Sequence, residues 1–236
     1  MKEKMDRPDS LSVIVIVKNG ERFLAEALQS IQCQTLPPLE ILVVDGGSTD
    51  RTAEIARSFP GVRYLSQPDS GISNAYNFGI AQARGELLAF LSHDDLWTPD
   101  KLAVQVGYLL THPACQYVVC RIHPFLEPGD TPPPGFRVEL LQQEPVAYIM
   151  ETLVVRRSVF AQVRSFDAAF RTAEDVDWFA RVFDHGITGY VCDLVLVHKR
   201  IHQGNSSIMD RESNGWIMSA LRQSVLRKRG TARTNP

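Results

Sequence analysis

Two positions in this chain place aspartates directly after apolar runs, as a site for a metal ion and phosphate requires. Asp45 ends "LEILVVD", and Asp94 and Asp95 follow "GELLAFLSH". Carboxylates held close together raise each other's pKa and cost stability, so an adjacent pair needs a compensating partner. Mn²⁺ and Mg²⁺ are such partners, because they bind a couple of carboxylates together with phosphate oxygens and water. A polar turn before a helix that begins near Pro99 is the alternative, and it explains one aspartate better than two.

A second acidic pair, Glu174 and Asp175, opens the segment "EDVDWFARVFD". A carboxylate within hydrogen-bond reach of a hydroxyl group can serve as its general base, and a helix start can project Asp175 into a crevice. Thr172 and Asp175 also have the spacing of a capping box, and acids near a helix N-terminus are stabilised by the helix dipole. Asp177 is a surface residue or a supporting carboxylate in this interpretation.

Near the C-terminus, "RIHQGNSS" contains one histidine and one arginine that could reach the same site. The imidazole of His202 suits Mn²⁺ better than Mg²⁺, although a hydrogen-bonded loop histidine is an equal alternative. Arg200 could pair with a phosphate oxygen or could be a solvated arginine at a strand end.

These residues must be positioned by the surrounding elements, and the hydrophobic pattern predicts an α/β fold. The predicted strands are short apolar runs rich in β-branched residues, at residues 11–17, 39–45, 62–67 and 86–91. Segments with helical periodicity lie between them, which predicts a mostly parallel, Rossmann-like sheet with helices on both faces. Ligands of such sheets bind at the carboxyl ends of the strands, where Asp45 and Asp94 fall.

A helix is expected from about Pro99 to Leu110, followed by a strand "QYVVC". The next segment, residues 121–136, contains three consecutive prolines and is interpreted as a loop. This loop covers the surface or acts as a lid over the site.

Composition excludes several classes of protein. Of 236 residues, 44% are hydrophobic, which is enough for one large domain. Lys plus Arg number 25 and Asp plus Glu 27, so no global basic field would hold nucleic acid. The four cysteines lack metal-ligand spacing and no apolar stretch is long enough to span a membrane, which suggests a reducing, cytoplasmic setting.

Five motifs in order resemble a known family across nearly all of residues 10–208. They are "SVIVIVKNGERFLAEALQSIQCQT", "EILVVDGGSTDRT", "SGISNAYNFGIAQARGELLAFLSHDDLWTPDKL", "AEDVDWFARV" and "RIHQGNSS". Together they are similar to family 2 glycosyltransferases of the inverting GT-A type. The resemblance implies an enzyme that moves a sugar from a nucleotide-diphosphate sugar, expected to be UDP-linked, to a hydroxyl acceptor of unknown identity in glycoconjugate synthesis.

The resemblance also implies roles for individual residues. Asp175 would be the catalytic base beside Glu174, and Asp94 the main ligand of a Mn²⁺ or Mg²⁺ ion, with Asp95 and His202 as further candidate ligands. The nucleotide-sugar would be bound by Val17, Asn19, Asp45, Gly46, Ser48, Asn74 and Asp94. Asp45 would contact the base, since a carboxylate can accept the N3–H of uracil. The family's metal motif is often Asp-x-Asp, and here Ser92 takes the place of its first acid.

The expected organisation follows from the same motifs. It comprises a tail (1–10), a transferase domain (11–208) with a nucleotide-sugar half (about 11–120) and an acceptor half (about 147–208), and a C-terminal helix with a basic tail (209–236). That helix would pack on the domain or touch an anionic membrane. The competing functions are a non-catalytic sugar-nucleotide binder, a nucleotidyltransferase and a dinucleotide- or methyl-donor-binding enzyme. The last two require a glycine-rich turn after the first strand, where only Gly20 occurs.

Overall fold

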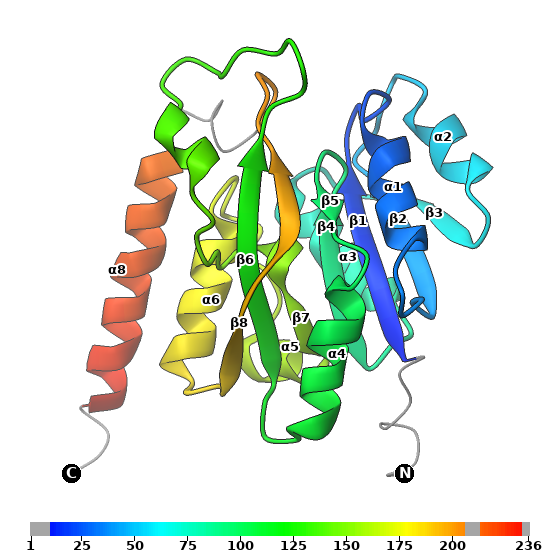
Figure 1. Ribbon diagram of the computed structural model, residues 1–236. Helices are drawn as coiled ribbons and strands as arrows, with labels where there is room; N and C mark the ends of the chain where they lie inside the picture. The colour runs from blue at the N-terminus through cyan, green and yellow to red at the C-terminus, as the bar shows by residue number, and fades with distance from the viewer. Residues whose placement is uncertain (1–9, 206–212, 233–236) are drawn as a thin grey trace.

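The computed structural model describes residues 10–205 and 213–232, and it is built on one eight-stranded sheet with the strand order β3-β2-β1-β4-β7-β6-β8-β5 (Figure 1). The strands are β1 (Leu11–Val17), β2 (Glu40–Asp45), β3 (Val62–Ser66), β4 (Leu87–Ser92), β5 (Leu96–Trp97), β6 (Tyr117–Phe125), β7 (Val154–Arg156) and β8 (Gly189–Arg200). The helices are α1 (Leu24–Gln32), α2 (Thr52–Ser58), α3 (Ile72–Gln82), α4 (Lys101–Thr111), α5 (Ser158–Val163), α6 (Glu174–Asp184) and α8 (Ser213–Ala232), with 3₁₀ turns η2 (Val138–Gln142) and η3 (Met150–Thr152). The N-terminal tail as far as residue 9, Ser206 and Ser207 of the last motif, and the end of the basic tail lie outside the described residues.

The first half of the sheet is parallel because its strands are apolar on both faces. β1 pairs in parallel with β2 and β4, with Ile14 opposite Leu42 on one side and Phe90 on the other. Side chains of α1, α2 and α4 cover one face of the sheet, and side chains of α3, α5 and α6 cover the other. The predicted α/β fold with helices on both faces is therefore confirmed.

One close contact fixes α3 against the sheet. A Cβ atom at Gly79 would lie 2.6 Å from Ile14 Cγ2, a distance that side chains do not tolerate. Glycine at this position therefore lets the helix that starts beside the site pack tightly on β1.

The second half of the sheet is mixed. β7 runs antiparallel to β4 and to β6, β6 runs parallel to β8, and the two-residue β5 is antiparallel to β8. The predicted loop at 121–136 is wrong at its beginning, because β6 continues to Phe125 and includes Pro124. β7 pairs only with Tyr117 and Val118, so the later part of β6 has one long strand partner and tolerates a residue without an N–H group.

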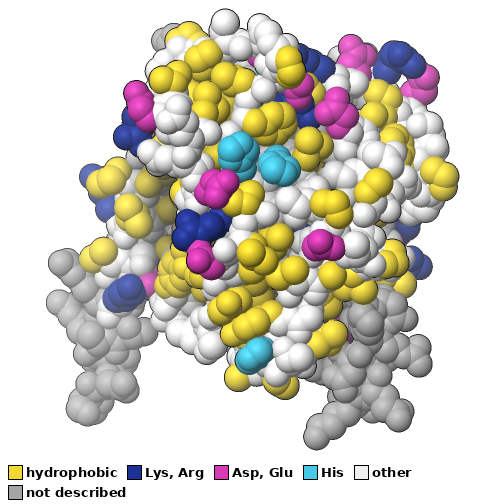
Figure 2. All heavy atoms as spheres, viewed as in Figure 1, with side chains coloured by type: hydrophobic (Ala, Val, Ile, Leu, Met, Phe, Trp, Pro, Cys, Tyr) yellow, Lys and Arg dark blue, Asp and Glu magenta, His cyan; other side chains and the backbone are white. Residues whose placement is uncertain are grey.

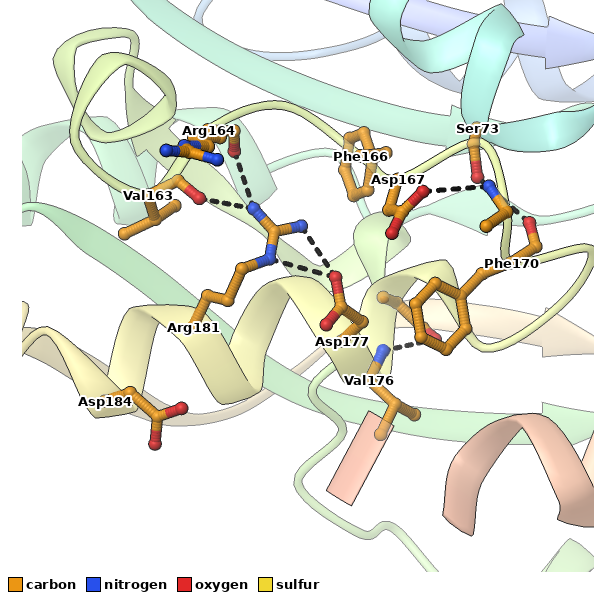
Figure 3. A network of polar contacts seen from close by, with 12 residues as sticks. Ser73, Val163, Arg164, Phe166, Asp167, Phe170, Val176, Asp177, Arg181 and Asp184 are labelled. Atoms are coloured by element: carbon orange, nitrogen blue, oxygen red, sulfur yellow. Dashed lines mark hydrogen bonds and ion pairs between the residues drawn. The ribbon is translucent and has the colours of Figure 1, made fainter. Parts of the chain in front are cut away.

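A buried ion pair ties α6 to the preceding segment (Figure 3). Arg181 Nη2 lies 2.8 Å from Asp177 Oδ2, and its guanidinium also donates hydrogen bonds to the backbone oxygens of Val163 and Arg164. Asp177 is only 2% exposed. The interpretation of Asp177 as a surface residue is wrong, since Asp177 is buried on the side of α6 that holds Arg181. Its interpretation as a supporting carboxylate stays a prediction.

The last described helix, α8, lies beside α6 (Figure 1). Ser224 Oγ and Arg227 Nε each donate a 2.8 Å hydrogen bond to the carboxylate of Asp184. Among residues 10–205 and 213–232, no helix has both the length and the apolar character needed to cross a membrane. On the face in Figure 2, charged side chains of both signs are interspersed with apolar ones, so this face has no patch of a single charge.

Candidate active site

A cavity of about 580 Å³ opens at the carboxyl ends of β1 and β4, between the starts of α3 and α6. This is the edge at which ligands bind in open parallel sheets. The charged and hydroxyl side chains that line the cavity belong to Lys18, Tyr76, Ser92, His93, Asp94, Glu151, Thr172, Glu174, Asp175 and Lys199. The cavity therefore brings together Asp94, which follows β4, and the acidic pair at the start of α6.

Asp94 lies in this cavity next to a histidine from the far end of the chain. Its Oδ2 atom is 2.9 Å from His202 Nε2 and accepts a 3.2 Å hydrogen bond from Asn205 Nδ2. Burial alone would raise the pKa of Asp94, but the hydrogen bond with His202 and the charge of Lys199 outweigh it and hold the pKa well below its ordinary value. Asp94 is consequently a carboxylate at neutral pH.

The pair of Asp94 and His202 fits a divalent cation. Ionised carboxylate and neutral imidazole are ligands that Mn²⁺ accepts, and phosphate oxygens and water would complete its shell. In the described part of the chain, no three His, Cys, Asp or Glu side chains form a ready metal cluster. A cation bound here would therefore take most of its ligands from the bound diphosphate and from solvent.

Asp95 occupies a different position from Asp94. It is fully buried, its Oδ2 lies 2.7 Å from Lys199 Nζ, and its Oδ1 accepts a 2.9 Å hydrogen bond from the Arg200 N–H. Both oxygens of Asp95 contact groups at the end of β8, and Asp95 is not among the residues that line the cavity. Its assignment as a supporting or alternate metal ligand stays a prediction. Its effect on the site is to hold Lys199 in place.

Arg200 is neither solvated nor directed at the cavity, so both interpretations of this residue are wrong. Its side chain is fully buried and lies over the rings of Phe23 and Phe125. Its guanidinium donates a 2.8 Å hydrogen bond to the Asp94 backbone oxygen and lies 2.7 Å from a Glu26 oxygen. Arg200 thus holds the backbone of Asp94 in place from behind.

The acidic pair at the start of α6 also lines the cavity. Burial raises the pKa of Asp175 to about 6, although the hydrogen bond from the Val176 N–H opposes this rise. Burial and the charge of Asp175 raise the pKa of Glu174 to about 8. The capping box proposed for Thr172 and Asp175 is wrong, because α6 begins at Glu174 without a side-chain cap. Asp175 thus lines the cavity as a carboxylate that takes up a proton more readily than an ordinary aspartate.

The turn after β2 is organised by Asp45, which is 2% exposed. Asp45 Oδ1 accepts hydrogen bonds from the Ser48 N–H and hydroxyl at 2.9 and 2.6 Å, and Oδ2 accepts one from the Tyr64 hydroxyl at 2.7 Å. A carboxylate has about four acceptor sites, so these three hydrogen bonds leave about one, and Asp45 itself is not among the residues that line the cavity. The assignment of Asp45 to the nucleotide base stays a prediction.

The other predicted donor-binding residues divide into two groups. Val17 and Gly46 line the cavity itself, whereas Asn19, Ser48 and Asn74 are not among its lining residues. Asn19 has a positive φ of 52° and links the turns after β1 and β2, because its N–H donates to Ser48 Oγ and its Oδ1 accepts from the Thr49 N–H. Asn74 Nδ2 donates a 2.7 Å hydrogen bond to the Ser70 backbone oxygen.

Sequence reasoning missed Glu151 and Lys199, although both line the cavity. Lys199 Nζ is 3.5 Å from Glu151 Oε1, and the charges of Asp95 and Glu151 raise the pKa of Lys199 well above its ordinary value against the opposing effect of burial. The available signal was the single acid in the apolar segment "VAYIMETLVV", which is unusual for a buried strand region.

Residues 12–175 match the sequence model described as glycosyl transferase family 2. The chain belongs to this family. An uncharacterized glycosyltransferase of Rickettsia typhi is 39% identical over 100 residues, which cover 42% of this family 2 chain and 31% of that protein. Putative glycosyltransferase EpsE of Bacillus subtilis is 27% identical over 202 residues, covering 79% of this chain and 71% of that one. The chain thus spans about a third of the length of the Rickettsia relative.

Solved structures of glycosyltransferases share the fold of this family 2 chain. TarS of S. aureus in complex with UDP-GlcNAc superposes with a TM-score of 0.74 at 18% identity, covering 92% of this chain and 66% of TarS. Mannosyltransferase PcManGT from Pyrobaculum calidifontis, in complex with GDP-Man and Mn²⁺, gives 0.63 at 20% identity, covering 96% and 65%. These likenesses confirm the expected GT-A fold.

Proposed function

We propose that this family 2 chain is a metal-dependent, inverting glycosyltransferase that moves a sugar from a nucleotide-diphosphate donor to a hydroxyl group of an acceptor. One observation carries the proposal: the carboxylate of Asp94, paired with His202, and the acidic pair Glu174 and Asp175 line the same cavity. Glycosyl transfer requires a group that accommodates the departing diphosphate and a base for the acceptor. One cavity offers candidates for both.

The donor is proposed to bind with its base near the turns after β1 and β2. Val17 and Gly46 would form the wall of this part of the cavity, and Asn19, Ser48 and Asp45 would keep that wall in shape. UDP is the proposed nucleotide, because the remaining acceptor site of Asp45 can take the N3–H of uracil. Related folds have been solved with UDP-GlcNAc and with GDP-Man.

The diphosphate is proposed to lie beside Asp94, where Asp94 and His202 would hold Mn²⁺ or Mg²⁺. When bound, the cation would neutralise the charge that develops on the departing diphosphate. Lys18 also lines the cavity and can offer its ammonium group to a phosphate oxygen. The buried side chain of Arg200 would keep Asp94 oriented throughout.

Asp175 is proposed as the general base that takes the proton of the acceptor hydroxyl. A base is most effective when its pKa is near the working pH, and burial raises the pKa of Asp175 to about 6. Asp175 would therefore be ionised at neutral pH and still accept a proton as the acceptor oxygen attacks. Glu174, with a pKa raised to about 8, would be mostly protonated and could donate a hydrogen bond to the sugar.

A non-catalytic sugar-nucleotide binder is the second candidate, because binding requires only the wall of the cavity. Unlike the enzyme, such a binder does not require a base with a raised pKa. A direct assay of donor consumption, with and without acceptor mixtures, separates the two.

A thermal-shift titration tests the proposed donor class. Purified protein would be titrated with UDP, GDP, dTDP and CMP, each with Mn²⁺, with Mg²⁺ or with a chelator. A ligand that binds only the folded state raises the melting temperature, so UDP with Mn²⁺ is expected to stabilise the protein and UDP with chelator to have little effect. No shift with any of the four nucleotides in the presence of metal would contradict the proposal.

A further inference from the structure

Glu151 is an acidic residue held rigidly inside the cavity. It lies in η3, and its backbone oxygen accepts a 3.1 Å hydrogen bond from Trp97 Nε1. Its Oε1 atom accepts a hydrogen bond from the Ser92 hydroxyl and is 3.5 Å from Lys199 Nζ. The side chain is 8% exposed, and Glu151 is one of the residues that line the cavity. The carboxylate is thus fixed at the cavity wall.

The charge of Glu151 is only partly balanced by the residues around it. The ammonium of Lys199 is closer to Asp95, at 2.7 Å, than to Glu151, at 3.5 Å. Two buried carboxylates therefore share one ammonium group, and a buried charge with an incomplete partner destabilises a fold. A role limited to holding Lys199 does not explain Glu151, because Asp95 already holds this residue.

The position of Glu151 in the cavity relates it both to Asp94, at the proposed diphosphate site, and to Asp175, the proposed base. Ser92, its hydrogen-bond donor, is two residues before Asp94 on the same strand end. Glu151 also lines the same cavity as Glu174 and Asp175. In a donor whose diphosphate lies at Asp94 and whose reacting carbon faces Asp175, the sugar ring would lie against Glu151.

We propose that Glu151 is a specificity-determining residue that accepts hydrogen bonds from hydroxyl groups of the transferred sugar and selects an uncharged sugar over one that carries a carboxylate. This inference rests on the proposed glycosyl transfer function. A fixed carboxylate is a strong acceptor for hydroxyl donors. The same carboxylate, with Asp175 in the same cavity, repels a uronate ring, because like charges in a poorly solvated cavity disfavour each other.

The test compares dissociation constants for UDP, UDP-glucose and UDP-glucuronate, measured by calorimetry with Mn²⁺. The two chains to compare are the wild type and Glu151→Gln, which keeps the size of the side chain and removes its charge. The wild type is expected to prefer UDP-glucose over UDP-glucuronate by at least about tenfold, the effect of one hydrogen bond to a charged group. Glu151→Gln is expected to reduce this preference by about tenfold and to leave the affinity for UDP itself unchanged.

Two further variants make the comparison specific. Glu86→Gln changes the same residue type at the opposite end of β4, where the side chain is exposed, and is expected to match the wild type. Ser92→Ala keeps the Glu151 carboxylate and removes the hydroxyl that orients it, so a smaller loss of the preference is expected. Ser92→Ala also serves as the test if Glu151→Gln does not fold.

The outcomes separate this inference from the function on which it rests. If the wild type binds no UDP compound and no other nucleotide, the proposed function fails. If the wild type binds UDP-glucose more tightly than UDP-glucuronate and both Glu151→Gln and Ser92→Ala keep the full preference, the proposed function stands and the role of Glu151 is refuted. Equal loss of affinity for UDP and UDP-glucose in folded Glu151→Gln would assign Glu151 a purely structural role and would also refute it.

Discussion

His202 Nε2 lies 2.9 Å from Asp94 Oδ2, although the two residues are 108 positions apart in the chain. β8 runs beside β6 and β5 and ends at Arg200, so the next residues pass directly over the strand end that carries Asp94. The His202 N–H donates a 2.8 Å hydrogen bond to Asn205 Oδ1, which closes a tight turn around the imidazole. The proposed metal site is therefore assembled from both halves of the sheet.

Replacing His202 with alanine is expected to weaken metal-dependent nucleotide binding. One of two protein ligands would be lost, so the affinity for Mn²⁺ in the presence of UDP is expected to fall by about 10- to 100-fold. The affinity can be followed by the Mn²⁺ dependence of the thermal shift with UDP. His112→Ala is the matched control, since His112 is exposed and stacked on Tyr108. Equal Mn²⁺ dependence in the wild type and in His202→Ala would exclude His202 as a ligand.

The rate of transfer is expected to increase with pH through a midpoint near 6. Asp175 acts as a base only when ionised, and its pKa is raised to about 6. Below this value the rate should fall about tenfold per pH unit, because the ionised fraction falls in that proportion. The measurement is the turnover number at saturating donor between pH 5 and 8. A flat profile over this range would argue against a carboxylate base with a raised pKa.

Glu174→Gln is expected to stabilise the protein in alkaline solution. The pKa of Glu174 is about 8 in the folded protein and near 4.5 when unfolded, so the folded state binds more protons between these values. The free energy of unfolding therefore falls as pH rises through this window, and it falls less in a variant that cannot ionise. Thermal melts at pH 5 and pH 9 measure the effect. A Glu174→Gln variant that is less stable than the wild type at both pH values would contradict the raised pKa of Glu174.

Arg181→Met is expected to destabilise the fold by about 2 kcal/mol, because it leaves the carboxylate of Asp177 buried with an incomplete partner. Arg227 Nη1, at 3.7 Å from Asp177 Oδ1, compensates for part of the loss. Urea denaturation gives the change in the free energy of unfolding. Arg51→Met breaks an exposed pair with Glu54 and serves as the control, for which little change is expected because exposed ion pairs contribute little to stability. Similar values for the two variants would show that burial of the pair has no energetic consequence.

The first half of the fold was predictable because its elements are locally encoded. The apolar runs at β1, β2 and β4 fit only buried parallel strands, and they placed Asp45 and Asp94 at the correct edge of the sheet. The extension of β6 past Pro124 was not predictable in this way. It depends on which strands become neighbours of β6, and a proline is acceptable only because one side of the strand lacks a long partner.

The carboxylates of the site could be predicted from the sequence, whereas the residues that hold them in place could not. Residue type predicts exposure for Arg200 and Asp95, yet both are buried because they pair with groups far away in the sequence. Glu151 was missed for the same reason, since its partners Ser92 and Lys199 come from other strands. Spacing along the chain carries no information about such long-range pairs.

The most direct test of the account compares Asp175→Asn with the wild type in two assays, donor binding and sugar transfer. Asparagine keeps the shape of the side chain and cannot take the proton of the acceptor hydroxyl, so transfer is expected to fall by about 10²- to 10⁴-fold. Binding of UDP with Mn²⁺ is expected to remain unchanged, because Asp175 lies at the acceptor end of the cavity in the proposed arrangement. Transfer by Asp175→Asn at the wild-type rate would contradict the central claim that this residue is the catalytic base.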